Sequence, residues 1–377
     1  MKQPMRSSIR RLVLLGAGHA HVHVLKSLMD APLPNTEVTL VSPYDRQVYS
    51  GMLPGWVAGH YQLEECVIPL ATLVAKIGVQ YQQTAAVRIN FESNEVHCAN
   101  GTKIAFDLIS IDTGPVADLS TIPGAAEHAI SIRPIESFIE SFQRIKDKIS
   151  ARTGNDKTRI AFVGAGAGGI ELALAMQYAF SKNQVEVTLI SAANTLPGSV
   201  GPKLAAILAA KGIRLLSGRT ATRIEGGAVH LQTGEIIGAD IIIAANGAAA
   251  AGWLGQSGLQ TDERGFVLVN DYLQSVSHEN VFAAGDCATM VNFIRPKSGV
   301  YAVRAGPPIA RNLRRYLNDE PLEAYAPQAR SLYLVSTGDR YAIASWGIFA
   351  LEGRWVWRWK DSIDRGFIAK YALPAKN

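Results

Sequence analysis

Residues 12–18 read LVLLGAG, and residues 160–166 read IAFVGAG. Both stretches are typical of a buried β-strand that runs into a glycine turn. A helical pattern and a second, β-branched strand follow each of them, and these second strands end at Ser42 and Ser191. The sequence therefore predicts two βαβ units in one chain.

The likeness of the two halves extends beyond these units. Residues 107–114 (DLISIDTG) and 240–247 (DIIIAANG) both run from an aspartate through an apolar stretch to a glycine. Each follows a hairpin pattern with a turn glycine. This repetition predicts an α/β fold with two Rossmann-like dinucleotide-binding domains. Glycines in such a loop permit a tight turn and bring the backbone close to a pyrophosphate, which binds at a helix N-terminus.

Composition excludes several function classes. The chain has 377 residues, of which 48% are hydrophobic, so it can bury more than one core. Its net charge of +5 comes without a long basic run, so we expect no nucleic-acid partner. We also expect no transmembrane helix, because no stretch is apolar over the roughly 20 residues that a membrane span needs. The cysteines, Cys66, Cys98 and Cys287, form neither a CxxC motif nor a metal-finger spacing, which favours a reducing cytoplasm.

Three histidines beside the first glycine turn, His19, His21 and His23, suggest a metal site. Helical spacing aligns only two of them, and a metal site needs three or four convergent ligands. We therefore expect no metal. These side chains are expected to pack at the start of the helix, where an imidazole can also hydrogen-bond a phosphate.

Residues 280–288 (NVFAAGDCA) form an apolar strand pattern that ends at a glycine, and Asp286 follows that glycine directly. Together with the two glycine loops, this order of motifs resembles the FAD-dependent pyridine nucleotide-disulfide oxidoreductase superfamily over almost the whole chain. Its wider relatives are type II NADH dehydrogenases and sulfide:quinone oxidoreductases. Further stretches narrow the resemblance to the NADH-dehydrogenase-like protein often fused to selenophosphate synthetase: residues 49–55 (YSGMLPG), 295–299 (RPKSG), 302–307 (AVRAGP) and 359–367 (WKDSIDRGF).

The resemblance implies an FAD-dependent dehydrogenase in which hydride passes from NAD(P)H to the flavin. Glu171 is then expected near the nicotinamide, and Lys297 is expected to hold the negative charge of the reduced flavin, so both are candidate catalytic residues. The residues expected to bind NAD(P) are Gly164, Gly166, Gly169 and Glu171. The residues expected to bind FAD are Gly16, Ala17, Gly18, His19, Ala20, Ser42, Ser50, Gly51, Met52, Val87, Thr113, Gly114, Gly285, Asp286, Lys297 and Gly299.

Three positions depart from the dinucleotide-binding pattern. His21 stands at the third glycine position of the first loop, and Ser42 replaces the acid expected to bind a ribose diol. The resembled subfamily shares both substitutions, so we interpret them as variation of the site. In the second half Ser191 is followed by Ala-Ala-Asn, with neither the acid that favours NAD nor an arginine that favours NADP. Coenzyme preference therefore stays open.

The order of motifs also divides the chain into domains. We expect residues 1–114 and 248–330 to form a divided FAD domain and residues 115–247 to form an inserted NAD(P) domain. Residues 331–377 are expected to form a separate C-terminal segment. The expected location is the cytoplasm, either free or on the cytoplasmic face of a membrane.

The C-terminal segment begins with the alternation of a short β-meander over residues 332–358. An amphipathic helix is expected after it, because Trp359, Ile363, Phe367 and Tyr371 recur at every fourth residue as one apolar stripe. This face fits three alternatives that the sequence leaves open: peripheral contact with a membrane, a homodimer contact, and packing on the chain's own FAD domain.

The electron acceptor is the least determined part of the function. A quinone is the first hypothesis, although Val300 and Arg304 stand where quinone-reducing relatives tend to have glutamines. A small sulfur or selenium species is the rival, because the Pro-Lys-Ser-Gly stretch resembles sulfide-oxidising relatives, although those use paired cysteines. A third hypothesis is an FAD-binding partner protein without turnover of its own.

Overall fold

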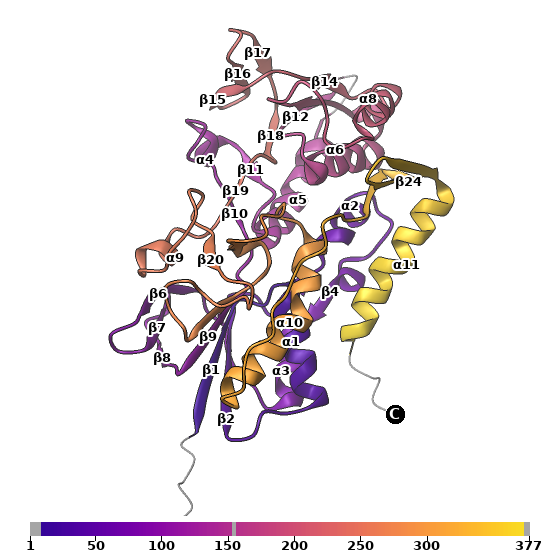
Figure 1. The fold of residues 1–377 in the computed structure, drawn as a ribbon. Coiled ribbons are helices and arrows are strands. Elements are labelled where there is room, and N and C mark those ends of the chain that lie inside the picture. Colours follow the sequence, from indigo (N-terminus) through magenta and orange to yellow (C-terminus); the bar gives the residue numbers. More distant parts are fainter. Residues whose placement is uncertain (1–8, 153–155, 373–377) are drawn as a thin grey trace, which may run out of the picture.

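Two lobes, each built around a parallel β-sheet, form the computed structural model, which describes residues 9–152 and 156–372 (Figure 1). The strand order in the first lobe is β21-β9-β1-β2-β5, and every neighbouring pair is parallel. Its central strands are continuous apolar runs, as expected for strands buried on both faces. The main elements of this lobe are β1 (Arg10–Leu15), α1 (His19–Asp30), β2 (Thr36–Val41), α3 (Leu70–Ile77), β5 (Gln80–Gln82), β9 (Leu108–Ile111), β21 (Val281–Ala283) and α10 (Gly299–Leu317).

The second lobe repeats this plan with the order β11-β18-β12-β13-β14, again all parallel. The α/β fold with two Rossmann-like domains is therefore confirmed. Its main elements are β11 (Ile130–Ser131), α5 (Ile135–Ser150), β12 (Thr158–Val163), α6 (Ala167–Ala179), α7 (Ser181–Gln184), β13 (Val185–Ile190), α8 (Gly201–Ala210), β14 (Arg214–Leu216) and β18 (Ile241–Ala244).

Each lobe also carries a small antiparallel sheet, and the two sheets share an irregularity. The register shifts between Ala86 and Arg88 in the first and between Ala221 and Arg223 in the second. The same bulge at the same place supports the interpretation of the chain as a repeat. The strands are β6 (Ala86–Asn90), β7 (Glu95–Cys98) and β8 (Lys103–Ala105), and β15 (Ala221–Glu225), β16 (Ala228–Leu231) and β17 (Ile236–Gly238).

Two short strands, β10 (Val116–Ala117) and β19 (Ala248–Ala249), pair where the chain passes between the lobes. After β19 the chain returns to the first sheet, where β21 pairs with β9. The exact domain limits stay predictions, and residues 1–8 and 373–377 lie outside the described residues. The remaining short elements are β3 (Arg46–Val48), η1 (Ser50–Met52), α2 (Leu53–Val57), η2 (Leu63–Cys66), β4 (Val67–Pro69), α4 (Ala125–His128), α9 (Trp253–Gln256), β20 (Val267–Val269), η3 (Gly285–Cys287) and β22 (Ala288–Met290).

The C-terminal segment is a three-stranded meander followed by a long helix, α11 (Arg354–Tyr371). The helix begins inside the range 332–358 that the sequence pattern placed in the meander, which corrects that prediction. Trp355, Trp357 and Trp359 stand at every second position, and this alternation imitates a strand. The strands are β23 (Tyr333–Thr337), β24 (Asp339–Trp346) and β25 (Phe349–Gly353).

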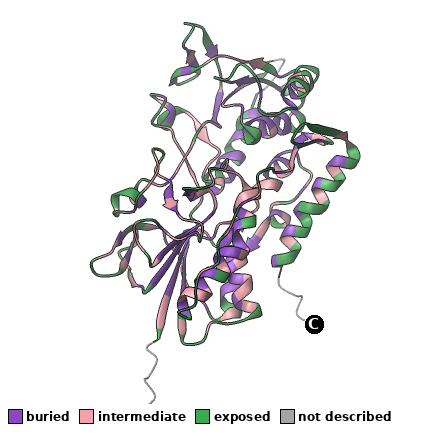
Figure 2. Ribbon diagram, viewed as in Figure 1, coloured by how far each residue is buried: buried purple, intermediate pink, exposed green. Residues whose placement is uncertain are grey.

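The buried face of α11 differs from the predicted stripe (Figure 2). Phe367 and Tyr371 are buried, but Trp359 and Ile363 are 40% and 42% exposed. The inward face instead carries a buried charged pair from the same helix. Of the three alternatives for this segment, packing on the chain's own first lobe therefore applies to part of the helix. Among the helices of the described residues, none has the length and apolar character needed to cross a membrane.

Candidate functional site

A cavity of about 1220 Å³ lies between the two lobes, and both glycine loops line it. Its size exceeds that of a usual small-ligand pocket, which suits dinucleotides. The structure brings most of the residues predicted from the sequence together here. Those that line the cavity are Gly16, Ala17, Gly18, His19, Ser42, Ser50, Gly51, Thr113, Gly114, Gly166, Gly169, Glu171, Asp286, Lys297 and Gly299.

The other predicted residues lie behind or beside the cavity wall. Ala20 is buried in α1, and Met52 packs against Tyr61 and Cys66. Val87 is 44% exposed on β6, while the two alanines before it line the cavity. The remaining two, Gly164 and Gly285, shape the backbone at positive φ and do not line the cavity.

The first glycine loop lies directly against the end of β9. A Cβ added at Gly16 would stand 2.5 Å from the Asp112 carbonyl oxygen, and one at Gly18 would stand 2.4 Å from the Asp112 carboxyl group. Gly16 also has a φ of +81°, which favours glycine. Because only glycine fits at these two positions, the loop packs directly on the strand end, and the N-terminus of α1 faces the cavity. These residues fit the pyrophosphate of FAD.

Asp112 stabilises the start of α1 from the neighbouring strand end. Its Oδ2 accepts hydrogen bonds from the backbone N–H groups of Ala20 and His21, at 2.8 and 2.9 Å. Burial raises the pKa of Asp112 to about 7, and the nearby charge of Asp286 adds to that rise. A carboxyl group that protonates near neutrality therefore stands beside the expected pyrophosphate position. The sequence analysis did not single out Asp112.

His21 replaces the third glycine of the first loop, and its ring is fully paired. Nδ1 lies 2.6 Å from the Gly16 carbonyl oxygen, and Nε2 lies 2.7 Å from the Ser110 hydroxyl. Burial lowers the pKa of His21 to about 4, so the ring is neutral. Since a carbonyl can only accept, Nδ1 carries the proton and Nε2 accepts from Ser110. His21 thus has a packing role, without a bond to a phosphate.

The second glycine loop keeps the full glycine pattern and is less enclosed. A Cβ at Gly169 would come within 2.3 Å of the Gly164 carbonyl oxygen, so α6 packs closely on β12. A Cβ at Gly166 would meet nothing within 4 Å. The residue equivalent to Asp112 is Ala245, which has no side-chain acceptor to cap the helix. These residues fit a second dinucleotide at the N-terminus of α6.

A buried ion pair from α11 forms part of the cavity wall. The Lys360 Nζ lies 2.6 Å from Asp364 Oδ2, and it also donates to the Gly51 carbonyl oxygen at 2.6 Å. Burial opposes the charge on Lys360, but the attraction of Asp364 and Glu171 holds its pKa above the ordinary value. Both side chains line the cavity beside Glu171. This pair was not predicted from the sequence.

Glu171 reaches the same place from α6 of the second lobe. Its Oε1 accepts hydrogen bonds from the Ser336 backbone N–H at 2.8 Å and from the Ser336 hydroxyl at 2.9 Å. Burial raises the pKa of Glu171. The C-terminal meander therefore positions this carboxyl group at the wall of the cavity.

Aromatic side chains attach α11 to the loop that follows β3. Tyr49 stacks on Phe367 with ring centroids 4.2 Å apart, and His19 meets Tyr49 edge-on at 5.5 Å. Tyr49, His19 and Phe367 all line the cavity. This contact fixes the C-terminal helix over the expected position of the flavin.

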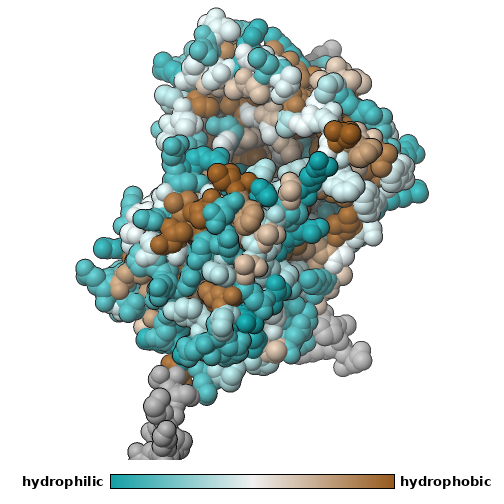
Figure 3. Space-filling view, in the orientation of Figure 1, coloured by the Kyte–Doolittle hydropathy of each residue, from teal (hydrophilic) through white to brown (hydrophobic). Residues whose placement is uncertain are grey.

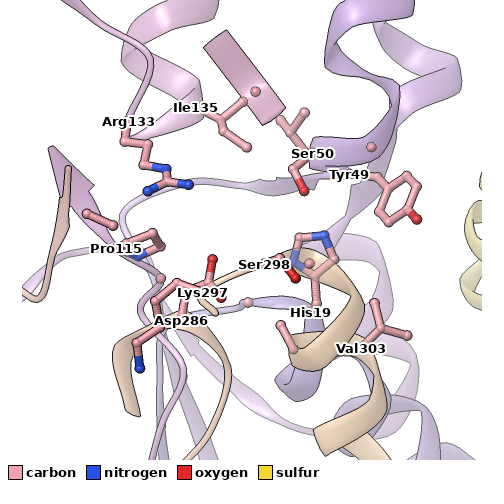
Figure 4. A pocket seen from close by; sticks show the side chains of 18 of the residues that line it. His19, Tyr49, Ser50, Pro115, Arg133, Ile135, Asp286, Lys297, Ser298 and Val303 are labelled. Carbon is pink, nitrogen blue, oxygen red and sulfur yellow. The ribbon is translucent and has the colours of Figure 1, made fainter. Parts of the chain in front are cut away.

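Asp286 and Arg133 reach into the cavity from opposite walls (Figure 4). Burial raises the pKa of Asp286, while Arg133 and Lys297 oppose that rise. The ammonium group of Lys297 is already bound: it donates to the Ala288 carbonyl and, at 2.8 Å, to the Thr289 hydroxyl. This geometry favours a supporting role for Lys297 over direct contact with a ring. Arg133 was not predicted from the sequence.

The cysteines and histidines that the sequence analysis considered take no part in a metal cluster. All three cysteines are buried and free, and none of them is among the residues that line the cavity. Burial raises the pKa of the Cys287 thiol to about 12. In the described part of the chain, no group of three or more His, Cys, Asp or Glu side chains could hold a metal ion.

Comparison with known proteins places this geometry in context. A family model described as "Pyridine nucleotide-disulphide oxidoreductase" matches residues 10–306. Ferroptosis suppressor protein 1 of Xenopus laevis is 27% identical over 67% of this chain and 68% of its own length. Type II NADH:quinone oxidoreductase of Staphylococcus aureus is 24% identical over 85% of this chain and 86% of its own length. The structure of the sulfide:quinone oxidoreductase from Aquifex aeolicus shares the fold, with a TM-score of 0.80 at 19% identity over 96% of this chain and 91% of that chain.

The raised pKa of Asp112 predicts a pH-dependent stability. Between its ordinary pKa of 3.8 and its folded pKa of about 7, the folded protein holds a proton that the unfolded chain releases. Stability is therefore lost as the pH rises through this window. Asp112→Asn removes the effect, so the free energy of unfolding of the variant minus that of the wild type should be larger at pH 8 than at pH 4, by about 2 to 4 kcal/mol.

Thermal and urea unfolding of the FAD-free protein at the two pH values measure this difference. Using the difference between variant and wild type cancels the titration of all other groups. The same difference at both pH values would show that Asp112 is ionised throughout and would contradict the prediction.

Proposed function

This chain belongs to the pyridine nucleotide-disulphide oxidoreductase family, and from that premise we propose that it passes electrons from NAD(P)H through bound FAD to a quinone. Family membership makes the chain an FAD-dependent oxidoreductase that uses NAD(P)H. The acceptor and the roles of individual residues are the proposed parts. The likeness to the subfamily fused to selenophosphate synthetase also stays a prediction.

The observation that carries the proposal is one cavity lined by both glycine loops. Residues 16–18 and 166–169 both border it, so two dinucleotides bound at the two helix N-termini can direct their reactive ends into the same space. We assign FAD to residues 1–114 and 248–330 and the nicotinamide nucleotide to residues 115–247. When bound, the flavin ring would take a hydride from the reduced nicotinamide and pass two electrons to the acceptor.

A quinone fits the wall of the cavity that α10 and α11 provide. Val303, Ile363 and Phe367 line it with apolar surface, while Val300 and Arg304 stand where glutamines were expected. Such a site suits a flat, largely apolar acceptor with polar edges. The names of the Staphylococcus aureus and Aquifex aeolicus relatives, each with quinone as acceptor, support the same class.

Reduction of a quinone to a quinol adds two electrons and two hydrogens; the hydride from the nicotinamide accounts for one hydrogen, and a buried carboxyl group of the cavity can supply the other as a proton. Glu171 has a raised pKa and can therefore donate a proton from Oε2, the oxygen that Ser336 does not bind. Lys360 stays protonated beside it and can stabilise the carboxylate that remains. We propose Glu171 as the proton donor and Lys360 as its positioning residue.

A sulfur or selenium species is the second candidate, and the cysteines argue against it. Sulfide-oxidising relatives use paired cysteines, whereas Cys66, Cys98 and Cys287 are buried and do not border the cavity. The remaining support is the Pro-Lys-Ser-Gly stretch, and its Lys297 and Gly299 do line the cavity.

Anaerobic titration of the purified, FAD-containing protein tests the first step. Addition of NADH or NADPH should bleach the visible flavin absorbance, because both nucleotide sites open into one cavity. A later addition of a soluble quinone should restore the absorbance. A yellow protein that neither nucleotide bleaches would contradict the dehydrogenase and favour a binding partner without turnover.

Lys360→Met tests the proton-handling role. The variant should reduce quinone at least about 100-fold more slowly, while reduction of the flavin by the nucleotide changes little. Without the cation, the pKa of Glu171 should rise, so the pH profile of the residual activity should move to higher pH. Lys360→Arg keeps the charge and should recover part of the rate. An unshifted pH profile in Lys360→Met would contradict the role of Lys360 as a positioning residue for Glu171.

The surface of the C-terminal meander suggests where the protein meets its quinone. Ile348 and Phe349, at the turn between β24 and β25, are 85% and 66% exposed, and Trp346 is 56% exposed. Figure 3 shows apolar side chains over this hairpin. Arg354 and Arg358 are exposed close by in the chain. Apolar and basic residues together favour an anionic membrane surface, so we propose peripheral docking on the cytoplasmic face.

Binding to vesicles that contain phosphatidylglycerol tests the docking surface. The double substitution Ile348→Asp and Phe349→Asp should weaken co-sedimentation at least about tenfold without slowing flavin reduction. Ile236→Asp, which changes an isoleucine that is 59% exposed on β17, is the matched control and should bind like the wild type. If the wild type is a dimer and the double substitution makes it a monomer, the surface is a contact with a second copy of the chain instead.

A further inference from the structure

The loops that follow β13 and β14 are joined by backbone hydrogen bonds. Ser191 donates to the Leu216 carbonyl oxygen at 2.9 Å, and Gly218 donates to the Ala193 carbonyl oxygen at 2.9 Å. The backbone N–H of Arg219 donates to the Ser191 carbonyl oxygen at 2.8 Å. An arginine that is remote in sequence therefore lies directly beside the end of β13.

The end of β13 is the place where a dinucleotide-binding domain recognises the adenosine ribose. An acid there binds the 2′-hydroxyl of NAD and repels the 2′-phosphate of NADP. Ser191 carries no charge, so nothing at this position repels a phosphate. The same loop adds Asn194, whose Oδ1 would stand 2.4 Å from a Cβ added at Gly218. The buried Ser191 hydroxyl donates to the Ala193 carbonyl oxygen at 3.1 Å, so the exposed Asn194 supplies the neutral hydrogen-bonding group at this spot.

Arg219 is half-buried and has no acidic partner within ion-pair distance among the described residues. Its side chain makes one long hydrogen bond, from Nη1 to the Gly218 carbonyl oxygen at 3.4 Å. The neighbouring arginines differ, because Arg214 pairs with Glu235 at 3.0 Å and Arg223 pairs with Glu225 at 2.6 Å. The charge of Arg219 is thus available to a ligand.

The first half of the chain provides an internal comparison. There, Ser42 donates to the Gln82 carbonyl oxygen, just as Ser191 donates to that of Leu216. The loop that follows, residues 83–85, reads QTA and carries no charge. We assign that half to FAD, whose adenosine has a free 2′-hydroxyl. A cation stands at this place only in the half assigned to the nicotinamide nucleotide.

We propose that Arg219 binds the 2′-phosphate of NADPH and makes the protein prefer NADPH to NADH. The guanidinium group forms paired, charge-assisted hydrogen bonds with phosphate oxygens, and Asn194 completes the site beside the uncharged Ser191. This inference rests on the proposed function, since it names the coenzyme of the same second lobe.

Calorimetric binding of two nucleotide fragments to the FAD-containing protein tests the inference without catalysis. Adenosine 2′,5′-bisphosphate should bind at least about tenfold more tightly than 5′-AMP, and Arg219→Leu should abolish most of this advantage. Arg219→Lys should keep part of it. Arg214→Leu, which removes an arginine already paired on the same sheet edge, should leave the ratio unchanged. Ser191→Asp should reverse the preference.

Equal binding of the two fragments by the wild type, or an advantage that survives in Arg219→Leu, would overturn the inference. Binding of neither fragment would overturn it as well. A protein that binds both fragments equally can still have its flavin bleached by NADH. That result would support the dehydrogenase activity and reject only the preference for NADPH, so the two proposals can fail separately.

Discussion

The close approach of each glycine loop to a neighbouring strand end is the constraint on which the rest of the molecule depends. A Cβ at Gly16 would stand 2.5 Å from the Asp112 carbonyl oxygen, and a Cβ at Gly164 would stand 2.5 Å from the backbone nitrogen of Asn246. Because neither position tolerates a side chain, both helices begin at the carboxyl edge of a parallel sheet. Two helix N-termini consequently border one cavity, which is the arrangement that coupled dinucleotide chemistry needs.

The two halves have diverged around this shared constraint. In the first half, polar side chains lie between the helix and the strand. His21 hydrogen-bonds to Gly16 and Ser110, and Asp112 caps the helix. The second half keeps Gly169 and Ala245 at the equivalent positions. We propose that the first site holds the resident cofactor, and that the second, which is more open, suits a nucleotide that must enter and leave. Lys360 and Asp364 of α11 form a further part of the cavity wall.

Local patterns predicted the fold and most of the wall of the cavity, because strand, turn and helix signals lie within short stretches. The repeat, the two βαβ units and the positions of the glycines could all be read in this way. Val87 lies in the bulge between Ala86 and Arg88 and is 44% exposed, so its role at the adenine stays a prediction. The start of α11 was missed, because alternating tryptophans imitate a strand.

The residues that sequence reasoning missed act through partners that are distant in the chain. Lys360 is buried because it binds the carbonyl oxygen of Gly51, and no local pattern encodes such a contact. Arg219 meets Ser191 only after β14 pairs with β13. For Asp112, the sequence could have given a signal. The first half has an aspartate where the second has Ala245, and it has His21 where the second has Gly169. Substitutions that differ between the two halves at matched positions therefore point to specialised residues.

The most direct test of the central claim is an experimental structure of the FAD-containing protein with NADP⁺ bound. The account predicts FAD along residues 16–18 and the nicotinamide nucleotide along residues 166–169, with the nicotinamide and flavin rings facing each other inside the single cavity beside Glu171. A nicotinamide ring bound outside this cavity, or a second glycine loop that stays empty at saturating NADP⁺, would contradict it.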